Sequence, residues 1–337
     1  MRVKLTAGTN VGCVRTNNED NFIANIDLSR PDWFVPTDVS EGVTLCDEGC
    51  AFVVADGMGG LNAGEVASAI AVEHVKQEFL NANLKKIVKS EKDVEKFMRG
   101  IVEKADAAIK KRVDEDPETK GMGTTLIFAW VIGRKAYLSW CGDSRGYLFN
   151  PETGLRRISK DHSYVQELVD AGKLDEDLAF DHPNSNIITR CLGDFKDRAN
   201  PDFVSVTLRT GDRILLCSDG LCGLCRDEEI VVTMNDFCED IEVCKKELIN
   251  SALNAGGYDN VTVALLEVVD DEESRELAST CEPTAKKTKK KKKSKKGVVV
   301  PFWLIFVFII TLLVIIAWFL KNTELRDKIL ESVNSIF

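Results

Sequence analysis

Histidine is scarce in this sequence, and the N-terminus lacks an apolar segment long enough to act as an export signal. The three histidines among 337 residues are too few to suggest a zinc enzyme with imidazole ligands. Without an export signal at residues 1–9, we expect the globular part of the chain in the cytoplasm, where thiols stay reduced. The sequence therefore argues against a secreted, disulfide-bonded protein and against a histidine-based metal site.

The eleven cysteines are scattered along the chain. Two pairs are close in sequence, Cys46 with Cys50 and Cys222 with Cys225, and the second pair forms a C-x-x-C motif. No second C-x-x-C and no pair of histidines stands at zinc-finger spacing. We predict that these cysteines are small buried hydrophobic residues, with a structural zinc or redox site as the alternative.

Charge is divided unevenly along the chain, whose formal net charge is -10. Residues 286–296 include nine lysines, so the remainder carries a formal charge of about -19. An acidic body argues against nucleic acid as a partner, because duplex binding requires a basic surface. Such a body suits a protein that holds cations.

The composition divides the chain into four segments. Residues 1–270 mix apolar runs with turn residues and are predicted to form the globular domain. Residues 271–297, acidic and then lysine-rich, contain almost nothing that could enter a core and are predicted to be a linker. Residues 298–320 carry no charge, and residues 321–337 form a short tail.

The uncharged segment 298–320 is long enough to span a membrane. As a helix it would be about 34 Å long, against a hydrocarbon layer of about 30 Å, and Trp303 and Trp318 lie near its ends. A buried core helix is the alternative, which the adjacent lysines disfavour. Positive flanks stay in the cytoplasm, so we expect a single-pass protein of the cell membrane with residues 1–270 in the cytoplasm and residues 321–337 outside.

Within residues 1–270, hydrophobic periodicity predicts two helices, at 63–80 and 91–113. These helices follow one another instead of alternating with strands, which favours an α+β fold with antiparallel sheets over a doubly wound parallel sheet. Strands are predicted where β-branched and aromatic residues are frequent, at 22–26, 51–55, 124–132, 135–141, 213–217 and 260–268.

Four aspartates share one kind of position, where a predicted strand meets a turn. Asp56 and Asp219 follow apolar strands and precede glycine, Asp143 follows the strand 135–141, and Asp259 precedes the strand 260–268. Carboxylates gathered at one end of a sheet repel one another unless cations neutralise them, and Mg²⁺ or Mn²⁺ prefers such oxygen ligands. Asp-Gly pairs are also common in ordinary turns, and these residues alone leave that alternative open.

Arg15 precedes two further acids, Glu19 and Asp20, just before the predicted strand 22–26. A guanidinium group can bind two phosphate oxygens at once. Most arginines are surface charges, but beside a predicted cluster of metal-binding carboxylates the favoured interpretation is phosphate binding.

Eight motifs occur in the order found in one enzyme family. They are GCVRTNNEDN, VVADGMGG followed by AGEVAS, GMGTTL, CGDSRGYL, SKDHSYVQELVDAG, ITRCLG, LLCSDGL and GGYDNVTV. On these motifs, residues 5–269 resemble the bacterial branch of the metal-dependent serine/threonine protein phosphatases, the PPM or type 2C family. The resemblance implies a four-layer α-β-β-α sandwich of two antiparallel sheets flanked by helices, and hydrolysis of phosphoserine and phosphothreonine in proteins.

The resemblance also implies the catalytic residues. Asp56 would bridge two Mn²⁺ or Mg²⁺ ions, the Gly57 carbonyl would contact one of them, and Asp219 and Asp259 would bind the first ion. A water molecule between the ions would be a hydroxide near neutral pH and would attack phosphorus in line. Arg15 would bind the substrate phosphate.

Further acids would complete the metal site. Glu19 or Asp20 would serve the second ion, and the sequence does not decide which of them is the direct ligand. Asp143 together with Asp219 would hold a third ion, so two to three ions are expected.

Residues 160–183 would form a flap beside the active site. Asp161, His162 and Ser163 belong to its motif, and for His162 we favour a structural role over proton transfer.

Three features depart from the family pattern. Met58 stands where animal members carry a histidine that is their proposed general acid, and bacterial members share the methionine. Tyr258 replaces the usual small residue before the last aspartate. Residues 27–49 exceed the expected hairpin and are either a surface insertion or a partner contact.

The implied partners are phosphorylated proteins, including a membrane-bound bacterial serine/threonine kinase whose sites the enzyme would reverse. We expect a monomeric catalytic domain. Two alternatives were weighed: a pseudophosphatase without turnover, disfavoured because the metal-binding aspartates are present, and a phosphatase of the sporulation or anti-sigma type with a narrow regulatory substrate.

Overall fold

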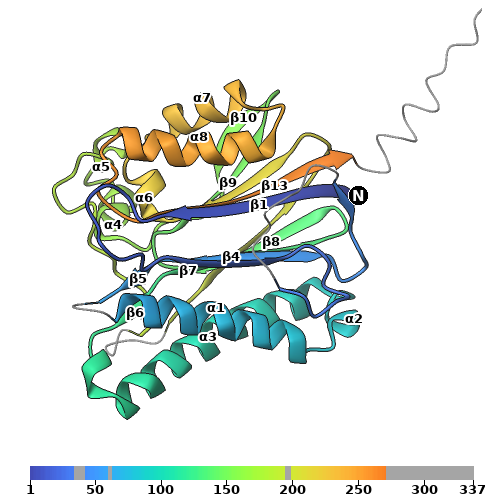
Figure 1. Cartoon of the computed structure of the whole chain (residues 1–337), viewed down its shortest axis with the longest axis horizontal. Coiled ribbons are helices and arrows are strands. Elements are labelled where there is room, and N and C mark those ends of the chain that lie inside the picture. Colours follow the sequence, from blue (N-terminus) through green and yellow to red (C-terminus); the bar gives the residue numbers. More distant parts are fainter. Residues whose placement is uncertain (34–41, 60–62, 194–198, 271–337) are drawn as a thin grey trace, which may run out of the picture. The chain divides into compact units, whose positions relative to one another are not determined.

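The structure is a computed structural model that describes residues 1–33, 42–59, 63–193 and 199–270. All of these residues belong to one compact unit, Met1–Glu282. Two antiparallel sheets lie face to face in this unit, with helices on the outer face of each sheet (Figure 1). The expected α-β-β-α arrangement is therefore confirmed, whereas the predicted linker, membrane helix and tail lie outside the described residues.

The first sheet has six strands in the order β10-β9-β12-β13-β1-β3. Helices α7 (Asp227–Asp236) and α8 (Ile241–Asn254) cover its outer face, and α6 (Asp219–Cys222) is a single turn after β12 (Figure 1). Buried leucines and valines from the helices and the sheet form one apolar cluster there. The strands are β10 (Gly154–Arg157), β9 (Arg145–Asn150), β12 (Arg213–Cys217), β13 (Val261–Asp270), β1 (Arg2–Asn10) and β3 (Val43–Thr44).

The second sheet has five strands in the order β11-β8-β7-β4-β2. Helices α1 (Gly64–Asn81) and α3 (Glu91–Glu115) lie across its outer face, joined through the short α2 (Leu84–Ile87) (Figure 1). The strands are β11 (Asp202–Thr207), β8 (Lys135–Cys141), β7 (Leu126–Ile132), β4 (Cys50–Ala55) and β2 (Asn21–Asn25). The remaining elements are the pair β5 (Gly57–Met58) and β6 (Gly123–Thr124), the 3-10 turn η1 (Pro117–Thr119), and the short helices α4 (Tyr164–Asp170) and α5 (Glu176–Ala179).

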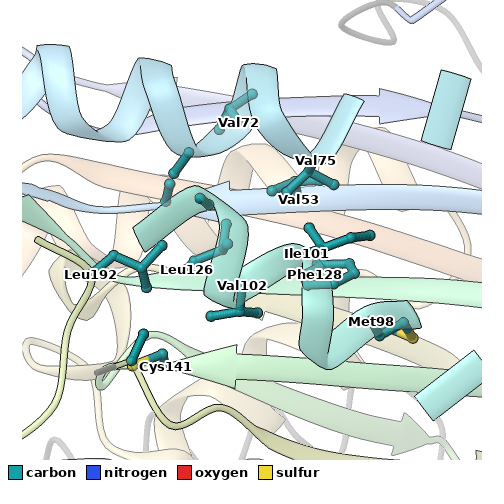
Figure 2. Packing of buried hydrophobic residues seen from close by; sticks show 14 of the residues in the cluster. Val53, Val72, Val75, Met98, Ile101, Val102, Leu126, Phe128, Cys141 and Leu192 are labelled. Atoms are coloured by element: carbon teal, nitrogen blue, oxygen red, sulfur yellow. The ribbon is translucent and has the colours of Figure 1, made fainter. Parts of the chain in front are cut away.

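Strand β4 shows how one segment serves two cores. Successive side chains of a strand point to opposite faces, and every residue of β4 is buried. Val53 packs with the α1–α3 helices, whereas Phe52 packs between the two sheets. Figure 2 shows Val53 beside Val75 of α1. Because full burial of such a side chain contributes about 1.5–3 kcal/mol, the alternation fixes which face of β4 meets the helices.

Most of the predicted elements are confirmed. The helices expected at 63–80 and 91–113 are α1 and α3, and the strands expected at 135–141 and 213–217 coincide with β8 and β12. The strand expected at 124–132 is wrong at its start. The chain pairs with β5 as far as Thr124 and joins the five-stranded sheet only at Leu126. Thr125 lies between them because its N–H donates to the carbonyl of Asp56.

The long segment 27–49 packs on the body at both of its described ends. Strand β3 pairs with the start of β1, Arg2 opposite Thr44, and the Trp33 ring lies 5.6 Å from the Phe79 ring of α1. The middle of the segment, 34–41, lies outside the described residues. In the described part of the chain, no helix has the length and apolar character to cross a bilayer.

Candidate active site

The predicted acidic turns lie at one end of the two sheets. Asp56, Asp143 and Asp219 follow β4, β8 and β12, whereas Asp20 and Asp259 come just before β2 and β13. Because all of these strands pair antiparallel, the ends of the first three lie beside the starts of the other two. In Figure 1 this is the end with β5 and α6, away from the N-terminus.

Asp20 and Asp143 are buried, Asp56 and Asp219 are partly buried, and Asp259 is more exposed, yet their carboxyl groups lie close enough to repel one another. Burial raises the pKa of Asp56 well above its usual range, and the nearby charges of Asp219, Asp20 and Asp143 raise it further. Burial also raises the pKa of Asp20 to about 8. The pKa of Asp219 is raised by burial and by Asp259, and a hydrogen bond links its carboxyl group to that of Asp56. Neutralisation by a proton or a cation is therefore required for this cluster.

Three carboxylate oxygens in the cluster have no hydrogen-bond partner although they are buried: Oδ1 of Asp20, of Asp143 and of Asp219. Buried charged oxygens without partners are costly unless they coordinate an ion. No three acidic, histidine or cysteine side chains of the described residues already surround one point as a finished metal site. The unpartnered carboxylate oxygens nevertheless fit hard divalent cations in their chemistry.

Asp20 is held by two hydroxyl groups. Ser218 and Thr262 both donate to its Oδ2, at 2.7 Å and 2.6 Å, which leaves its Oδ1 directed into the cluster. Ser218 also accepts a hydrogen bond from the Thr262 N–H at 3.0 Å. Sequence patterns did not indicate either hydroxyl residue, although Ser218 precedes Asp219 within LLCSDGL.

Another hydroxyl pair joins two of the acidic turns. The Thr125 Oγ1 accepts a hydrogen bond from the Asp56 N–H at 3.0 Å and lies 2.7 Å from the Ser144 Oγ. Ser144 directly follows Asp143, so the two hydroxyl groups fix the spacing between the Asp56 and Asp143 turns. Sequence patterns did not single out either residue. The signal that the sequence offers is a hydroxyl residue inside the motifs GMGTTL and CGDSRGYL.

The backbone around Gly57 leaves no room for a side chain. A Cβ atom there would lie 2.2 Å from the Gly64 carbonyl oxygen and 2.6 Å from that of Glu19. The Glu19 carbonyl is held by the Gly57 N–H at 3.2 Å and by the Ser68 hydroxyl at 2.6 Å. Strand β5, the start of α1 and the segment before β2 therefore touch backbone to backbone.

Glu19 lies at the margin of the cluster. Burial raises the pKa of its carboxyl group, and the charge of Glu65 raises it further. The Glu65 Oε2 is itself buried without a hydrogen-bond partner. Glu19 and Asp20 both reach the acidic region, so the choice of direct ligand between them stays a prediction.

Arg15 extends beside the acidic cluster. Its guanidinium group contacts the Asp259 Oδ2 at 2.8 Å, and its side chain is 51% exposed. This pair raises the pKa of Arg15. An exposed ion pair is weak, so a phosphate group could compete for the guanidinium fork.

The flap motif is tied to the acidic turns. The Asp161 carboxylate accepts hydrogen bonds from the Nε and Nη2 of Arg145. Arg145 comes two residues after Asp143, so this contact joins the flap motif to the Asp143 turn. The His162 Nδ1 accepts from the Gly142 N–H at 3.1 Å. Burial lowers the pKa of His162, so its imidazole is neutral and holds the turn that carries Asp143.

Ser163 caps helix α4, since its side chain accepts from the Gln166 N–H at 3.3 Å. A cavity of about 240 Å³ separates the flap helices from α7. Its charged lining includes Arg145, Arg157, Asp161, Glu176, Arg226 and Asp227. The cavity borders the flap and does not contain the acidic cluster.

The described cysteines are free thiols. Cys50, Cys217 and Cys222 are among those that are fully buried, and burial raises the pKa of the Cys225 thiol to about 11. The prediction of small buried hydrophobic residues is thus confirmed for these positions. It is wrong for Cys46, which is only partly buried and whose thiol donates to the Gly49 carbonyl at 3.3 Å. The alternative of a structural zinc has no support among the described residues, which contain no group of three metal-binding side chains.

The departure at Tyr258 does not disturb Asp259. The Tyr258 side chain points outward, with 63% of the residue exposed, and its ring packs over Gly256, whose Cβ would lie 2.6 Å from it. The replaced residue therefore changes the surface beside the last acidic turn and leaves the turn itself in place.

Comparison with known proteins agrees with this geometry. The chain is 35% identical over 268 residues to protein phosphatase PhpP of Streptococcus pneumoniae, which covers 78% of this chain and 97% of that protein. It is 34% identical over 271 residues to serine/threonine protein phosphatase PstP of Mycobacterium tuberculosis, covering 80% of this chain but 45% of that protein.

The catalytic domain of PstP, solved in complex with two manganese ions, superimposes with a TM-score of 0.61 at 32% identity. The match covers 80% of this chain and 99% of that domain. Residues 42–255 match the family model described as protein phosphatase 2C. Since this match spans more than half of the sequence, the chain belongs to the protein phosphatase 2C family.

Proposed function

We propose that this phosphatase removes phosphate from serine and threonine side chains of proteins in a reaction that needs Mg²⁺ or Mn²⁺. The observation that supports the proposal most is the convergence of buried carboxylates with unpartnered oxygens at one end of the sheets. Such a cluster is unstable without cations. The family membership and the two manganese ions in the PstP domain point to the same chemistry.

The residues that would hold the ions follow from their places in the cluster. Asp56 lies among the other acids and, together with the Gly57 carbonyl, would help to hold the ions. Asp219 and Asp259 would hold one ion from the other sheet, and Asp143 with Asp219 would hold a third. Bound divalent ions lower the pKa of water toward neutrality and offset charge on phosphoryl oxygens.

The chain's own groups would bind and orient the substrate. Arg15 would release Asp259 and place its fork on two phosphate oxygens. Ser218 and Thr262 would hold Asp20 so that only its Oδ1 faces the cluster, and His162 would keep the Asp143 turn in place. No covalent enzyme intermediate is needed, so the buried cysteines have no part in the reaction.

The proposed setting is the cytoplasmic face of the cell membrane. This rests on the predicted span 298–320 and the lysines before it. Phosphorylated proteins, a membrane-bound serine/threonine kinase among them, are the proposed partners, because a shared surface raises the effective concentration of both. Removal of residues 298–337 should release the protein from membranes and leave peptide hydrolysis intact.

Turnover of a phosphothreonine peptide by the wild type and by Asp219→Ala tests the proposed function. We expect Mn²⁺-dependent release of phosphate by the wild type, its loss in EDTA, and loss in Asp219→Ala at every Mn²⁺ concentration. Binding of the phosphopeptide by the wild type without any release of phosphate would instead indicate a pseudophosphatase.

A further inference from the structure

Asn260 uses its whole side chain to hold one loop. It follows Asp259 at the entry to β13 and is 4% exposed. Its Nδ2 donates to the carbonyl oxygens of Val11 and Asn17, both at 2.9 Å, and its Oδ1 accepts from the Glu19 N–H at 2.8 Å. Both amide hydrogens and the carbonyl oxygen of the Asn260 side chain therefore have hydrogen-bond partners.

The loop so held, residues 11–20, contains no helix or strand. Its other direct ties to the segment before β13 are few. The Cys13 N–H donates to the Gly257 carbonyl at 2.7 Å, and Arg15 pairs with Asp259 in a half-exposed position. An exposed ion pair contributes little to stability, so the buried amide is the most extensive of these ties between the loop and the entry to β13. The end of the loop has further restraints, because Ser218 and Thr262 hold Asp20 and the Gly57 N–H and Ser68 hold the Glu19 carbonyl.

The same loop carries groups of two kinds, Arg15 for the phosphate and Glu19 with Asp20 for metal. Asn260 stands next to Asp259, which belongs to the other side of the site. Asparagine is disfavoured at the start of a buried strand, and here it forms no hydrogen bond within the sheet through its side chain. Its contacts all serve the loop.

We propose that Asn260 is a positioning residue that keeps Arg15 and Glu19 in register with Asp259. One buried amide thereby aligns the phosphate-binding group with the metal-binding groups. The inference rests on the proposed function and adds a residue that touches neither phosphate nor metal. Small displacements in an active site are costly, since a misplacement of about 1 Å can lower the rate about a hundredfold.

The test compares Asn260→Ala with Arg15→Ala and with the double variant. In Asn260→Ala we expect the KM for a phosphothreonine peptide and the Mn²⁺ concentration for half-maximal activity both to rise, by about tenfold or more. Arg15→Ala should raise the KM alone. Because residues that act together are not additive, the effect of Arg15→Ala on KM should shrink in the Asn260→Ala background, and fully additive effects would overturn the proposal.

Asn150→Ala is the matched control. Asn150 is 5% exposed, donates to the Asp212 Oδ1 at 2.8 Å and accepts from the Glu152 N–H at 2.9 Å, at the other end of the sheets. Both alanine variants should lower the Tm, but only Asn260→Ala should change KM and the Mn²⁺ requirement. Equal kinetic effects of the two variants would reduce Asn260 to a structural residue.

Hydrogen exchange provides a readout that does not depend on turnover. The amides of Cys13 and Glu19 should exchange faster in Asn260→Ala and keep their wild-type rates in Asn150→Ala. Unchanged protection of both amides would overturn the proposal even if the wild type hydrolysed no phosphopeptide, so the two failures remain distinguishable. If Asn260→Ala does not fold, Asn260→Ser, which keeps a polar side chain, takes its place in the same measurements.

Discussion

The two ends of the paired sheets treat buried charge in opposite ways. At the end away from the acidic cluster, Arg213 is 1% exposed and donates to Glu267 at 2.6 Å and to the carbonyl oxygen of Cys238. Asp212 there is also buried and accepts from Asn150 and from the Arg209 N–H. At the catalytic end, three buried carboxylates keep an oxygen without any partner.

This contrast separates charge that stabilises a fold from charge that serves a site. A buried ion that has all its partners can be retained at modest cost, whereas a buried carboxylate without them destabilises the protein. A site keeps buried carboxylate oxygens without hydrogen-bond partners when a ligand such as a metal ion supplies the missing partner. The loop held by Asn260 and the hydroxyl pairs around Asp20 and Asp56 supply the order that the repelling acids themselves cannot provide.

Asp56→Asn should have the largest effect, and in opposite senses on activity and stability. It removes the central carboxylate, so phosphate release should fall at least about a thousandfold. The Tm in EDTA should rise, because one repelling group in the buried cluster is gone. Activity assays and calorimetry check this, and an unchanged or lowered Tm would show that the cluster is not electrostatically strained.

Arg213→Met should have the opposite profile. Loss of the guanidinium leaves the Glu267 carboxylate, whose side chain is 16% exposed, with only the Lys4 Nζ at 4.0 Å, and breaking a buried pair costs about 3–5 kcal/mol. Urea unfolding should show this loss, with kcat per folded molecule unchanged. In the matched double variant with Glu267→Leu, part of the lost stability should return; a further loss would contradict the pairing argument.

Mn²⁺ should stabilise the protein through the catalytic end alone. At a hundredfold excess over its Kd, an ion that binds only the folded state adds about 2.7 kcal/mol. Thermal unfolding with Mn²⁺ and with EDTA measures the difference, which should vanish in Asp56→Asn and persist in Arg213→Met. A shift of equal size in both variants would point to ion binding elsewhere.

A pH trend in EDTA should also distinguish the catalytic end. The pKa of Asp20 rises from its ordinary value to about 8 in the folded protein, so the folded state binds more protons than the unfolded state between about pH 4 and 8. Stability should therefore decrease as pH rises through this window. The Tm at pH 5, 6, 7 and 8 tests the sign, and Asp20→Asn should flatten the curve; a Tm that increases with pH would contradict it.

Sequence patterns were sufficient for the antiparallel α+β class and for the acidic turns, whereas the four layers followed from the family resemblance. Strands such as β8 and β12 carry continuous apolar runs, and the aspartates stand where those runs stop, so pattern and place coincide. Periodicity did not indicate the helices α7 and α8, and in α8 a lysine, Lys245, lies among the buried residues and interrupts the apolar face. The break at Thr125 was also missed, because a hydrogen bond to the Asp56 backbone, distant in sequence, decides it.

The supporting residues of the site were harder to find than the acids. Thr125, Ser144, Ser218 and Thr262 are common residue types whose function depends on which distant chain segment they meet. Pairings such as that of Thr262 with Asp20 arise only when two strands from far apart in the chain lie together. The polarity of a single residue carries no signal of such a meeting.

The contact of Gly57 with Gly64 has a consequence for how α1 can vary. Where two main chains touch without side chains between them, no rotamer can absorb a displacement. Substitutions on the solvent side of α1 should therefore cost little. A shift of the helix along its axis by even a fraction of a turn would instead move the carbonyl of Glu19 and the turn after β4 together. The spacing of the acids is thus a property of the main chain. A methyl group at position 57 would force the main chains of β5 and α1 apart.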